Sequence, residues 1–219
     1  MGNLQAAINQ AMSICWDESI GYNLGGMAHS SADGVDCSGL VGRCLSDAGG
    51  YNYPTYHVGT INMKPALISA GFTIIPITAN GQIEGLIQSG DIVVMNHLDM
   101  TGGHTFFYVE NIQAYTDAGA DSANIGNVAK AKVEASSSRG HTAQGDSKKN
   151  GTGAYWEVWC HAYYSLISGY DPTDPNDEVY IARDSSSNSS SEGAIQYVLS
   201  QYFRKRRLED ANFTDWVDL

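Results

Sequence analysis

Hydrophobic positions near the N-terminus recur at spacings of three and four residues. Over residues 4–16 this stripe consists of Leu4, Ala7, Ile8, Ala11, Met12, Cys15 and Trp16. The spacing predicts an amphipathic helix whose apolar side, which includes Cys15, faces the core.

A second helix is predicted directly after a loop rich in Gly and Ser. Its apolar positions are Leu40, Val41, Cys44 and Leu45. Asp36 is placed as its N-cap, so that Cys37 stands at the helix N-terminus. A thiol there faces unpaired backbone N–H groups and the positive end of the helix dipole, which favour the thiolate and are placed to hold an oxyanion. We therefore expect Cys37 to be a nucleophile; the alternative is a buried structural cysteine, which we expect Cys44 to be.

Short apolar runs bounded by turn residues predict strands further along the chain. They cover residues 72–75, 92–95, 104–109, 132–135 and 155–164. Pro76 follows the first run, so this strand should end there or lie at a sheet edge. A short helix is expected over residues 64–70, and the polar stretches 113–131 and 136–153 are expected to be loops. Helices followed by an antiparallel meander predict an α+β fold.

The composition changes after Gly169. Residues 169–191 are rich in Asp, Pro and Ser and are expected to form a linker. Their alternating aspartates lack the glycine and glutamate spacing of a calcium-binding EF-hand loop. Residues 192–219 contain apolar positions at helical spacing, which predict a C-terminal helical segment for docking or self-association. The expected organisation is one domain over residues 1–168, a linker, and this segment.

The charge and the cysteines exclude several classes of protein. Twenty-four acidic and 12 basic residues give a net charge of −12, which argues against a nucleic-acid or anionic-membrane partner. The four cysteines form no CxxC pair, so neither a zinc site nor a dithiol redox motif is indicated, and no cofactor is expected. If Cys37 is reactive, the remaining three fit poorly with a disulfide framework and favour a reducing compartment.

We see no signal peptide and no run near the ~20 apolar residues of a membrane span.

A cysteine nucleophile needs a base within hydrogen-bond reach. His104 begins a predicted strand after Gly102 and Gly103, so its ring can reach a cleft while its backbone is held rigidly. It should share one strand face with Phe106 and Tyr108. We expect His104 to be the base. The other histidines lie in loops or among packed aromatic residues: His29, His57, His97, His141 and His161.

Four blocks then form a recognisable pattern. They are Tyr22-Asn23-Leu24-Gly25-Gly26, Asp36-Cys37-Ser38-Gly39-Leu40-Val41, Gly90-Asp91-Ile92-Val93 and Gly103-His104-Thr105. In composition and order they resemble the NlpC/P60 superfamily of cell-wall cysteine peptidases, and within it the bacteriophage amidase and endolysin branch. The resemblance covers residues 4–164. It implies a papain-like fold, in which the cysteine helix packs on an antiparallel sheet that carries the histidine.

The resemblance also implies roles for individual residues. Cys37 would attack an amide carbonyl and His104 would be the base. The third position falls on Glu134, where the family most often has His, Asn or Gln; a carboxylate can accept the second imidazole N–H, and the alternative is an exposed strand carboxylate. Tyr22, Ser38 and Asp36 complete the oxyanion and substrate-binding set, with Asp36 chiefly a helix cap.

The implied activity is hydrolysis of bacterial peptidoglycan at an amide in or next to the stem peptide. Two bonds remain open, N-acetylmuramoyl–L-alanine and D-glutamate–diamino acid, with specificity expected in loops 51–64 and 136–153. Four aromatic residues either line a substrate groove or belong to the core: Tyr51, Tyr53, Tyr56 and Trp156. Without a signal peptide, we expect a phage lysin held in the host cytoplasm until release to the wall, or a virion-associated protein. The alternatives are a papain-like hydrolase or acyltransferase acting on another amide, and a non-catalytic wall-binding or virion module.

Overall fold

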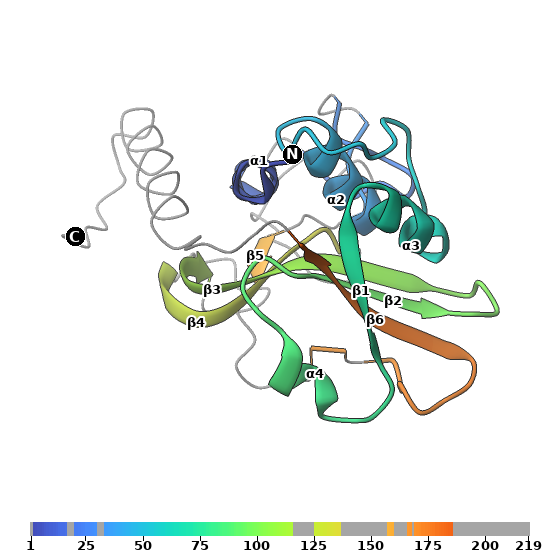
Figure 1. Ribbon diagram of the computed structural model, residues 1–219. Coiled ribbons are helices and arrows are strands. Elements are labelled where there is room, and N and C mark those ends of the chain that lie inside the picture. The colour runs from blue at the N-terminus through green and yellow to red at the C-terminus, as the bar shows by residue number, and fades with distance from the viewer. Residues whose placement is uncertain are drawn as a thin grey trace, which may run out of the picture.

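A six-stranded sheet forms the centre of the fold in the computed structural model, which describes residues 2–16, 20–29, 33–115, 125–136, 157–159, 166–167 and 169–185 (Figure 1). The strands are β1 (Phe72–Ile77), β2 (Ile92–His97), β3 (Gly103–Tyr115), β4 (Ile125–Glu134), β5 (Glu157–Trp159) and β6 (Asp177–Asp184). Their order across the sheet is β1-β6-β2-β3-β4-β5, and adjacent strands are antiparallel. One parallel pairing, Tyr115 with Trp159, also joins β3 to β5. The α+β class predicted from the sequence is confirmed.

The helices lie on both sides of this sheet. They are α1 (Leu4–Trp16), α2 (Cys37–Ser46), α3 (Thr60–Ser69) and the short α4 (Gln82–Leu86). Figure 1 shows α1, α2 and α3 together over one face and α4 at the other. The first helix has the bounds that the apolar stripe predicts, and the second begins at Cys37 as expected.

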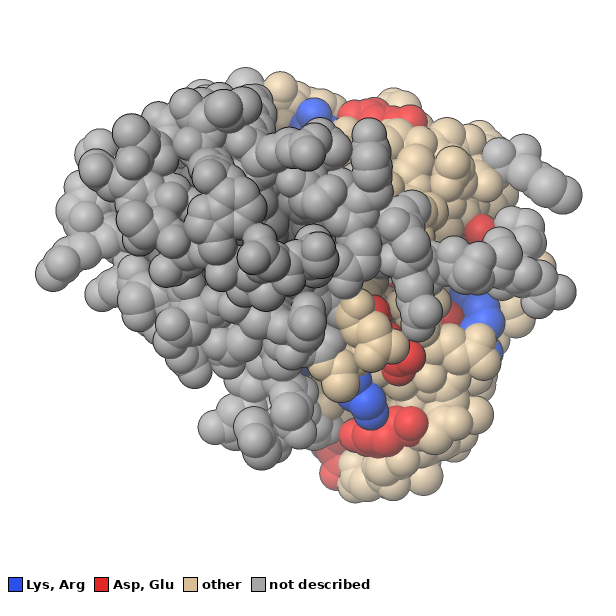
Figure 2. Space-filling view, turned by 90° about the vertical axis from the view of Figure 1, so that its left-hand side faces the viewer, with Lys and Arg blue, Asp and Glu red and all other residues tan. Residues whose placement is uncertain are grey.

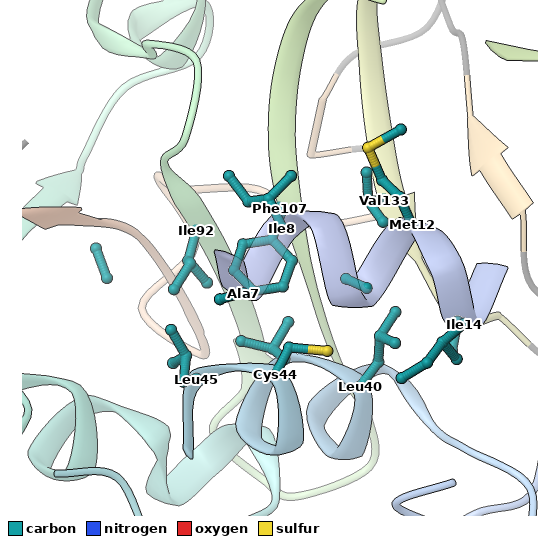
Figure 3. Close-up of a cluster of buried hydrophobic side chains, with 14 of the residues drawn as sticks. Ala7, Ile8, Met12, Ile14, Leu40, Cys44, Leu45, Ile92, Phe107 and Val133 are labelled. Carbon is teal, nitrogen blue, oxygen red and sulfur yellow. The ribbon is translucent and has the colours of Figure 1, made fainter. Parts of the chain in front are cut away.

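The main core lies between the sheet and the first two helices. Figure 3 shows Ala7, Ile8 and Met12 from α1, Leu40, Cys44 and Leu45 from α2, and Ile92, Phe107 and Val133 from the strands. All nine are at most 1% exposed. A second cluster, which includes Ile83 of α4, Val93, Phe106 and Ile181, covers the opposite face. The two clusters confirm the predicted alternation along β3, since Phe107 and Val109 belong to the first and Phe106 and Tyr108 to the second.

The strand β6 corrects the predicted linker. Residues 177–184 pair with β1 on one side and with β2 on the other, so the sheet extends beyond residue 168 and the linker prediction is wrong for this segment. Val179, Tyr180, Ile181 and Ala182 are all buried. A strand covered on both faces shows a continuous apolar run in place of alternation, and the Asp- and Pro-rich turns before it obscure that run.

Smaller differences concern where elements begin and end. The helix expected over residues 64–70 spans Thr60–Ser69 instead. Residues 113–115 and 125–131 of the predicted loop 113–131 belong to β3 and β4 instead. Pro76 lies within β1, which is an edge strand as expected. The predicted loop 136–153 beyond residue 136, residues 160–164, the C-terminal segment 192–219, Trp156 and Cys160 lie outside the described residues.

Charged side chains are scattered over the described surface that Figure 2 shows. On that face, Lys and Arg lie singly beside Asp and Glu, and the described residues form no continuous basic patch there. In the part of the chain that the structure describes, no helix combines the length and the apolar character of a membrane span.

Candidate active site

Cys37 is the first residue of α2, where the helix leaves its first backbone N–H groups without helical partners. Asp36 caps the helix as predicted, because its Oδ1 accepts the Gly39 N–H at 2.7 Å. The cap fixes the direction in which the chain enters the helix. It places the Cys37 side chain beside the positive end of the helix dipole, at 7% exposure.

His104, near the start of β3, lies close enough to the Cys37 side chain for the thiol to contribute to the raised pKa of the histidine. Its Nε2 lies 2.7 Å from Oε2 of Glu134, which leaves Nδ1 as the ring nitrogen that can serve as a base. Gly103 comes just before it and pairs with Asn96 of β2. A Cβ at this glycine would lie 2.0 Å from Oγ1 of Thr60, so only glycine lets α3 approach the strand this closely.

Glu134 is the last residue of β4, and its side chain is only 4% exposed. The alternative of an exposed strand carboxylate is therefore wrong. The Cys15 thiol of α1 lies 3.8 Å from the Glu134 carbonyl oxygen and donates to it. Helix α1 thus contacts the backbone that carries the carboxylate, and the predicted core position of Cys15 is confirmed. The structure brings Cys37, His104 and Glu134 into one chain of contacts.

The charges around His104 favour its protonated form. Burial alone would lower its pKa, but the negative charge of Glu134, hydrogen bonds with Cys37 and Glu134, and the charge on Cys37 outweigh this effect. Together they raise the pKa of His104 from 6.5 to about 10. At neutral pH the ring of His104 is therefore positively charged beside the Glu134 carboxylate.

Tyr22 lies within electrostatic range of the same thiol. Its segment pairs with Val35 just before the helix cap, and the neighbouring Gly26 carbonyl would lie 1.9 Å from a Cβ on Gly39. Burial and then the negative charges of Cys37 and Asp36 raise the pKa of Tyr22 well above its ordinary value of 10. Its phenol therefore stays neutral and keeps a hydrogen that it can donate.

Asp36 also organises a polar cluster that includes a histidine which the sequence analysis does not single out. Oδ1 accepts from the Ser38 hydroxyl at 3.0 Å as well as from the helix backbone. Oδ2 accepts from the Gly25 N–H at 2.7 Å and from His57 Nε2 at 2.8 Å. Ser38 Oγ lies 3.1 Å from the same Nε2. Asp36 is only 2% exposed and accepts from four protein donors. Its described contacts therefore cap α2 and hold His57 in place.

His57 also lines a hollow of about 770 Å³ between residues 52–59 and α3. Because His57 also contacts Asp36 and Ser38, the two neighbours of Cys37 in the chain, the hollow borders the N-terminus of α2. It lies within the loop 51–64, where the sequence analysis expects specificity. Tyr56 lines it and is 70% exposed, whereas Tyr51 and Tyr53 are buried at 8% and 4%. Of the aromatic residues left open by the sequence, Tyr51 belongs to the core, Tyr53 is a core residue at the wall of the hollow, and Tyr56 is an exposed residue that lines the hollow.

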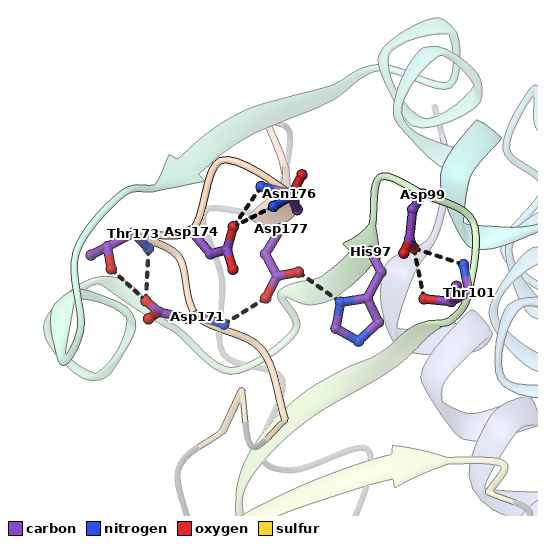
Figure 4. A network of polar contacts seen from close by, with 8 residues as sticks. All are labelled: His97, Asp99, Thr101, Asp171, Thr173, Asp174, Asn176 and Asp177. Carbon is purple, nitrogen blue, oxygen red and sulfur yellow. Dashed lines mark hydrogen bonds and ion pairs between the residues drawn. The ribbon is translucent and has the colours of Figure 1, made fainter.

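A second polar network lies near the β2–β3 turn. Figure 4 shows His97 bonded to Asp177 through Nδ1, at 2.6 Å, while Asp171 and Asp174 accept from the turn residues Thr173 and Asn176. The ring of Tyr170 stacks on His97 with centroids 4.5 Å apart. Burial, the charge on Cys37 and the charge on Asp177 raise the pKa of Tyr170 to about 12. Periodicity gives no signal for this network, because its members lie in turns and at strand ends.

The remaining described cysteines and carboxylates indicate no other chemistry. Cys44 is fully buried, which raises the pKa of its thiol strongly and confirms it as an inert core residue. Cys15, Cys37 and Cys44 are free thiols. Among the described residues, no group of three or more His, Cys, Asp or Glu side chains is placed to hold a metal ion.

Comparisons with protein-family models, curated proteins and solved structures give no match for this chain. What the site can do must therefore be argued from its chemistry. The site contains a thiol at a helix N-terminus, a histidine that interacts with the thiol, and a carboxylate bonded to the histidine. These groups can serve as a nucleophile, its base and the group that orients the base. Backbone N–H groups and a neutral tyrosine beside the thiol can receive developing negative charge on an oxygen.

Proposed function

We propose that this protein is a cysteine hydrolase that cuts an amide bond of bacterial peptidoglycan. The observation that carries the proposal is the contact chain from Cys37 through His104 to Glu134. The antiparallel sheet that carries the histidine, with the cysteine helix packed against it, supports a papain-like arrangement. The four sequence blocks that resemble NlpC/P60 enzymes contribute Tyr22, Cys37 and His104, so the resemblance and the chemistry concern the same residues.

In the first half of the reaction, Cys37 Sγ attacks the carbonyl carbon of the amide. As the C–S bond forms, the carbonyl electron pair moves to oxygen, which the Cys37 backbone N–H and the Tyr22 hydroxyl stabilise. The His104 imidazolium then gives its proton to the amide nitrogen. The C–N bond breaks, the amine leaves, and a thioester remains on Cys37.

In the second half, neutral His104 takes a proton from a water molecule. The resulting hydroxide attacks the thioester carbonyl, the C–S bond breaks, and a carboxylic acid is released while the thiolate and imidazolium are restored. Glu134 holds the ring in one orientation and stabilises its positive charge in both halves.

Lysis of purified cell walls by the full chain tests this proposal. We expect the wild-type protein to reduce the turbidity of a wall suspension and Cys37→Ala to lose this activity by at least ~10³-fold. Cys44→Ala is the matched control, because it removes a thiol from the same helix at a buried position. Equal lysis by wild type and Cys37→Ala would contradict the proposal. Mass spectrometry of the released fragments identifies the new carboxyl and amino termini, and the absence of new termini would indicate another substrate.

A further inference from the structure

We propose that the hollow beside His57 binds a saccharide, and that the scissile bond is therefore the amide that joins the glycan to the stem peptide. This inference rests on the proposed function and selects one of its two bonds, N-acetylmuramoyl–L-alanine. The hollow has a volume of about 770 Å³, within the range of roughly 300–1,000 Å³ that small-molecule sites occupy.

The lining of the hollow has the chemistry of a site for a neutral polar ligand. Among the described residues that line it, none is Lys, Arg, Asp or Glu. Asn52 and Asn62 each present an exposed side-chain amide, which can both donate and accept. Tyr56 adds an exposed ring with an apolar face and a hydroxyl tip. Amides, hydroxyls and an aromatic face match the hydroxyl, N-acetyl and C–H groups of an amino sugar.

The ring of His57 is fixed in one orientation. The Asp36 carboxylate can only accept, so the Nε2 that lies 2.8 Å from it carries a hydrogen. Nδ1 of a neutral ring is then an acceptor, suited to the N–H of an N-acetyl group or to a sugar hydroxyl. His57, a lining residue of the hollow, is thus held in place by Asp36 and Ser38.

The stem peptide is the less suitable occupant. It carries carboxylates, and a carboxylate loses solvation in a hollow unless a cation replaces the lost water. The described lining holds no permanent cation, and the net charge of the chain is −12, so an anionic group would be repelled.

The position of the hollow connects the sugar to the reaction. His57 Nε2 lies 3.1 Å from Ser38 Oγ and 2.8 Å from Asp36 Oδ2, so the hollow that His57 lines borders the N-terminus of α2, where Cys37 stands. In muramic acid that carbonyl is attached to the sugar through a lactyl ether, only a few bonds from the ring. In the alternative substrate, an alanine and a glutamate separate the sugar from the carbonyl.

The reaction at the sugar-linked amide follows the proposed mechanism. Cys37 Sγ attacks the lactyl carbonyl carbon, and the bond between this carbon and the alanine nitrogen breaks as the nitrogen receives the His104 proton. Water then cleaves the thioester and releases the lactyl carboxylic acid.

Binding of two small probes to the full chain tests the inference without relying on turnover. Titrations by ligand-observed NMR use di-N-acetylchitobiose as the neutral sugar and the tripeptide L-Ala-γ-D-Glu-L-Lys as the peptide. We expect saturable binding of the sugar to the wild type and to Cys37→Ala. Binding should weaken about tenfold or more in Tyr56→Ala and in Asn62→Ala, both of which change exposed side chains. Ile68→Ala, on α3 and 55% exposed but outside the lining, is the matched control and should bind as wild type does.

Several results would overturn the inference. The sugar fails to bind at millimolar concentration, or it binds equally well to wild type, Tyr56→Ala and Asn62→Ala. The tripeptide binds instead, and the same two variants weaken its binding. Lysis releases fragments with a new carboxyl terminus at D-glutamate. Lysis that depends on Cys37 without sugar binding would reject the subsite and leave the proposed function standing. Sugar binding without such lysis would reject the proposed function and leave the subsite.

Discussion

Oε2 of Glu134 lies 2.7 Å from Nε2 of His104, although 30 residues separate the two in the chain. The carboxylate is almost completely buried and its negative charge helps to raise the pKa of His104 to about 10. Since the reaction that we propose needs a protonated ring to release the amine, this pair sets the upper pH limit of activity.

Glu134→Gln should lower kcat/KM about 10²–10⁴-fold and move the alkaline limb of the pH profile to lower pH by about one unit or more. The amide keeps the shape of the side chain but loses the charge that raises the pKa of His104, so the ring loses its proton at lower pH. The measurement is the pH dependence of kcat/KM on a soluble muropeptide. Glu84→Gln, an exposed change in α4, should leave the profile unchanged. An unshifted alkaline limb in Glu134→Gln would show that the carboxylate does not control the histidine.

Tyr22→Phe should lower kcat about 10²-fold with little change in KM, because it removes a neutral donor that acts on the developing oxyanion. The ring itself is retained, so the midpoint of thermal unfolding should move little. Steady-state kinetics on the same muropeptide measure the effect. If kcat is unchanged while the protein remains folded, Tyr22 has no part in oxyanion stabilisation.

Asp36→Ala should destabilise the protein by about 2–4 kcal/mol, because it removes the α2 cap and leaves several donors without their acceptor. Asp36→Asn keeps an oxygen that can cap the helix, so it should lower the free energy of unfolding by less than Asp36→Ala does. Urea unfolding monitored by circular dichroism gives the free energy of unfolding. Asp47→Ala, which removes the surface ion pair of Arg43 and Asp47 at the other end of α2, should change it by less than about 1 kcal/mol. If Asp36→Ala and Asp47→Ala lowered the free energy of unfolding equally, the role assigned to Asp36 would be contradicted.

Gly39→Ala should destabilise the fold by about 1–3 kcal/mol or prevent folding, because its Cβ would lie 1.9 Å from the Gly26 carbonyl oxygen. Gly85→Ala is the matched control, since Gly85 is also helical but a Cβ there meets no atom within 4 Å. That change should be neutral or slightly stabilising, because alanine has the higher helix propensity. Thermal unfolding of the two variants separates these outcomes, and equal stability would argue against close packing of the Tyr22 segment on α2.

The parts of this structure that could be predicted from the sequence are those with a local signal. The spacing of apolar residues gives α1, and a capping aspartate before an apolar stripe gives the start of α2. The resemblance implies a third site residue on the strand after His104, in an apolar-polar-Ala-Ser context that residues 133–136 match, and so points to Glu134. Periodicity alone does not distinguish this residue from a solvent-exposed strand residue.

The parts that could not be predicted depend on contacts between distant segments. The strand β6 is buried on both faces and follows polar turns, so it lacks the alternation that marks a half-buried strand. His57 reaches Asp36 across 21 residues of chain through an irregular segment. Tyr170 stacks on His97 only because the sheet brings β6 beside β2. No spacing rule connects residues in such positions.

The most direct test of the account is the rate at which iodoacetamide alkylates Cys37 at neutral pH, followed by peptide mass spectrometry. All three described cysteines are buried. We predict that Cys37 of the wild type nevertheless reacts at least ~10-fold faster than Cys15 and Cys44, because it stands at a helix N-terminus close to His104, and that His104→Ala removes most of this advantage. A Cys37 that reacts as slowly as the two core thiols, or equally fast with and without His104, would contradict the claim that these residues act as one catalytic unit.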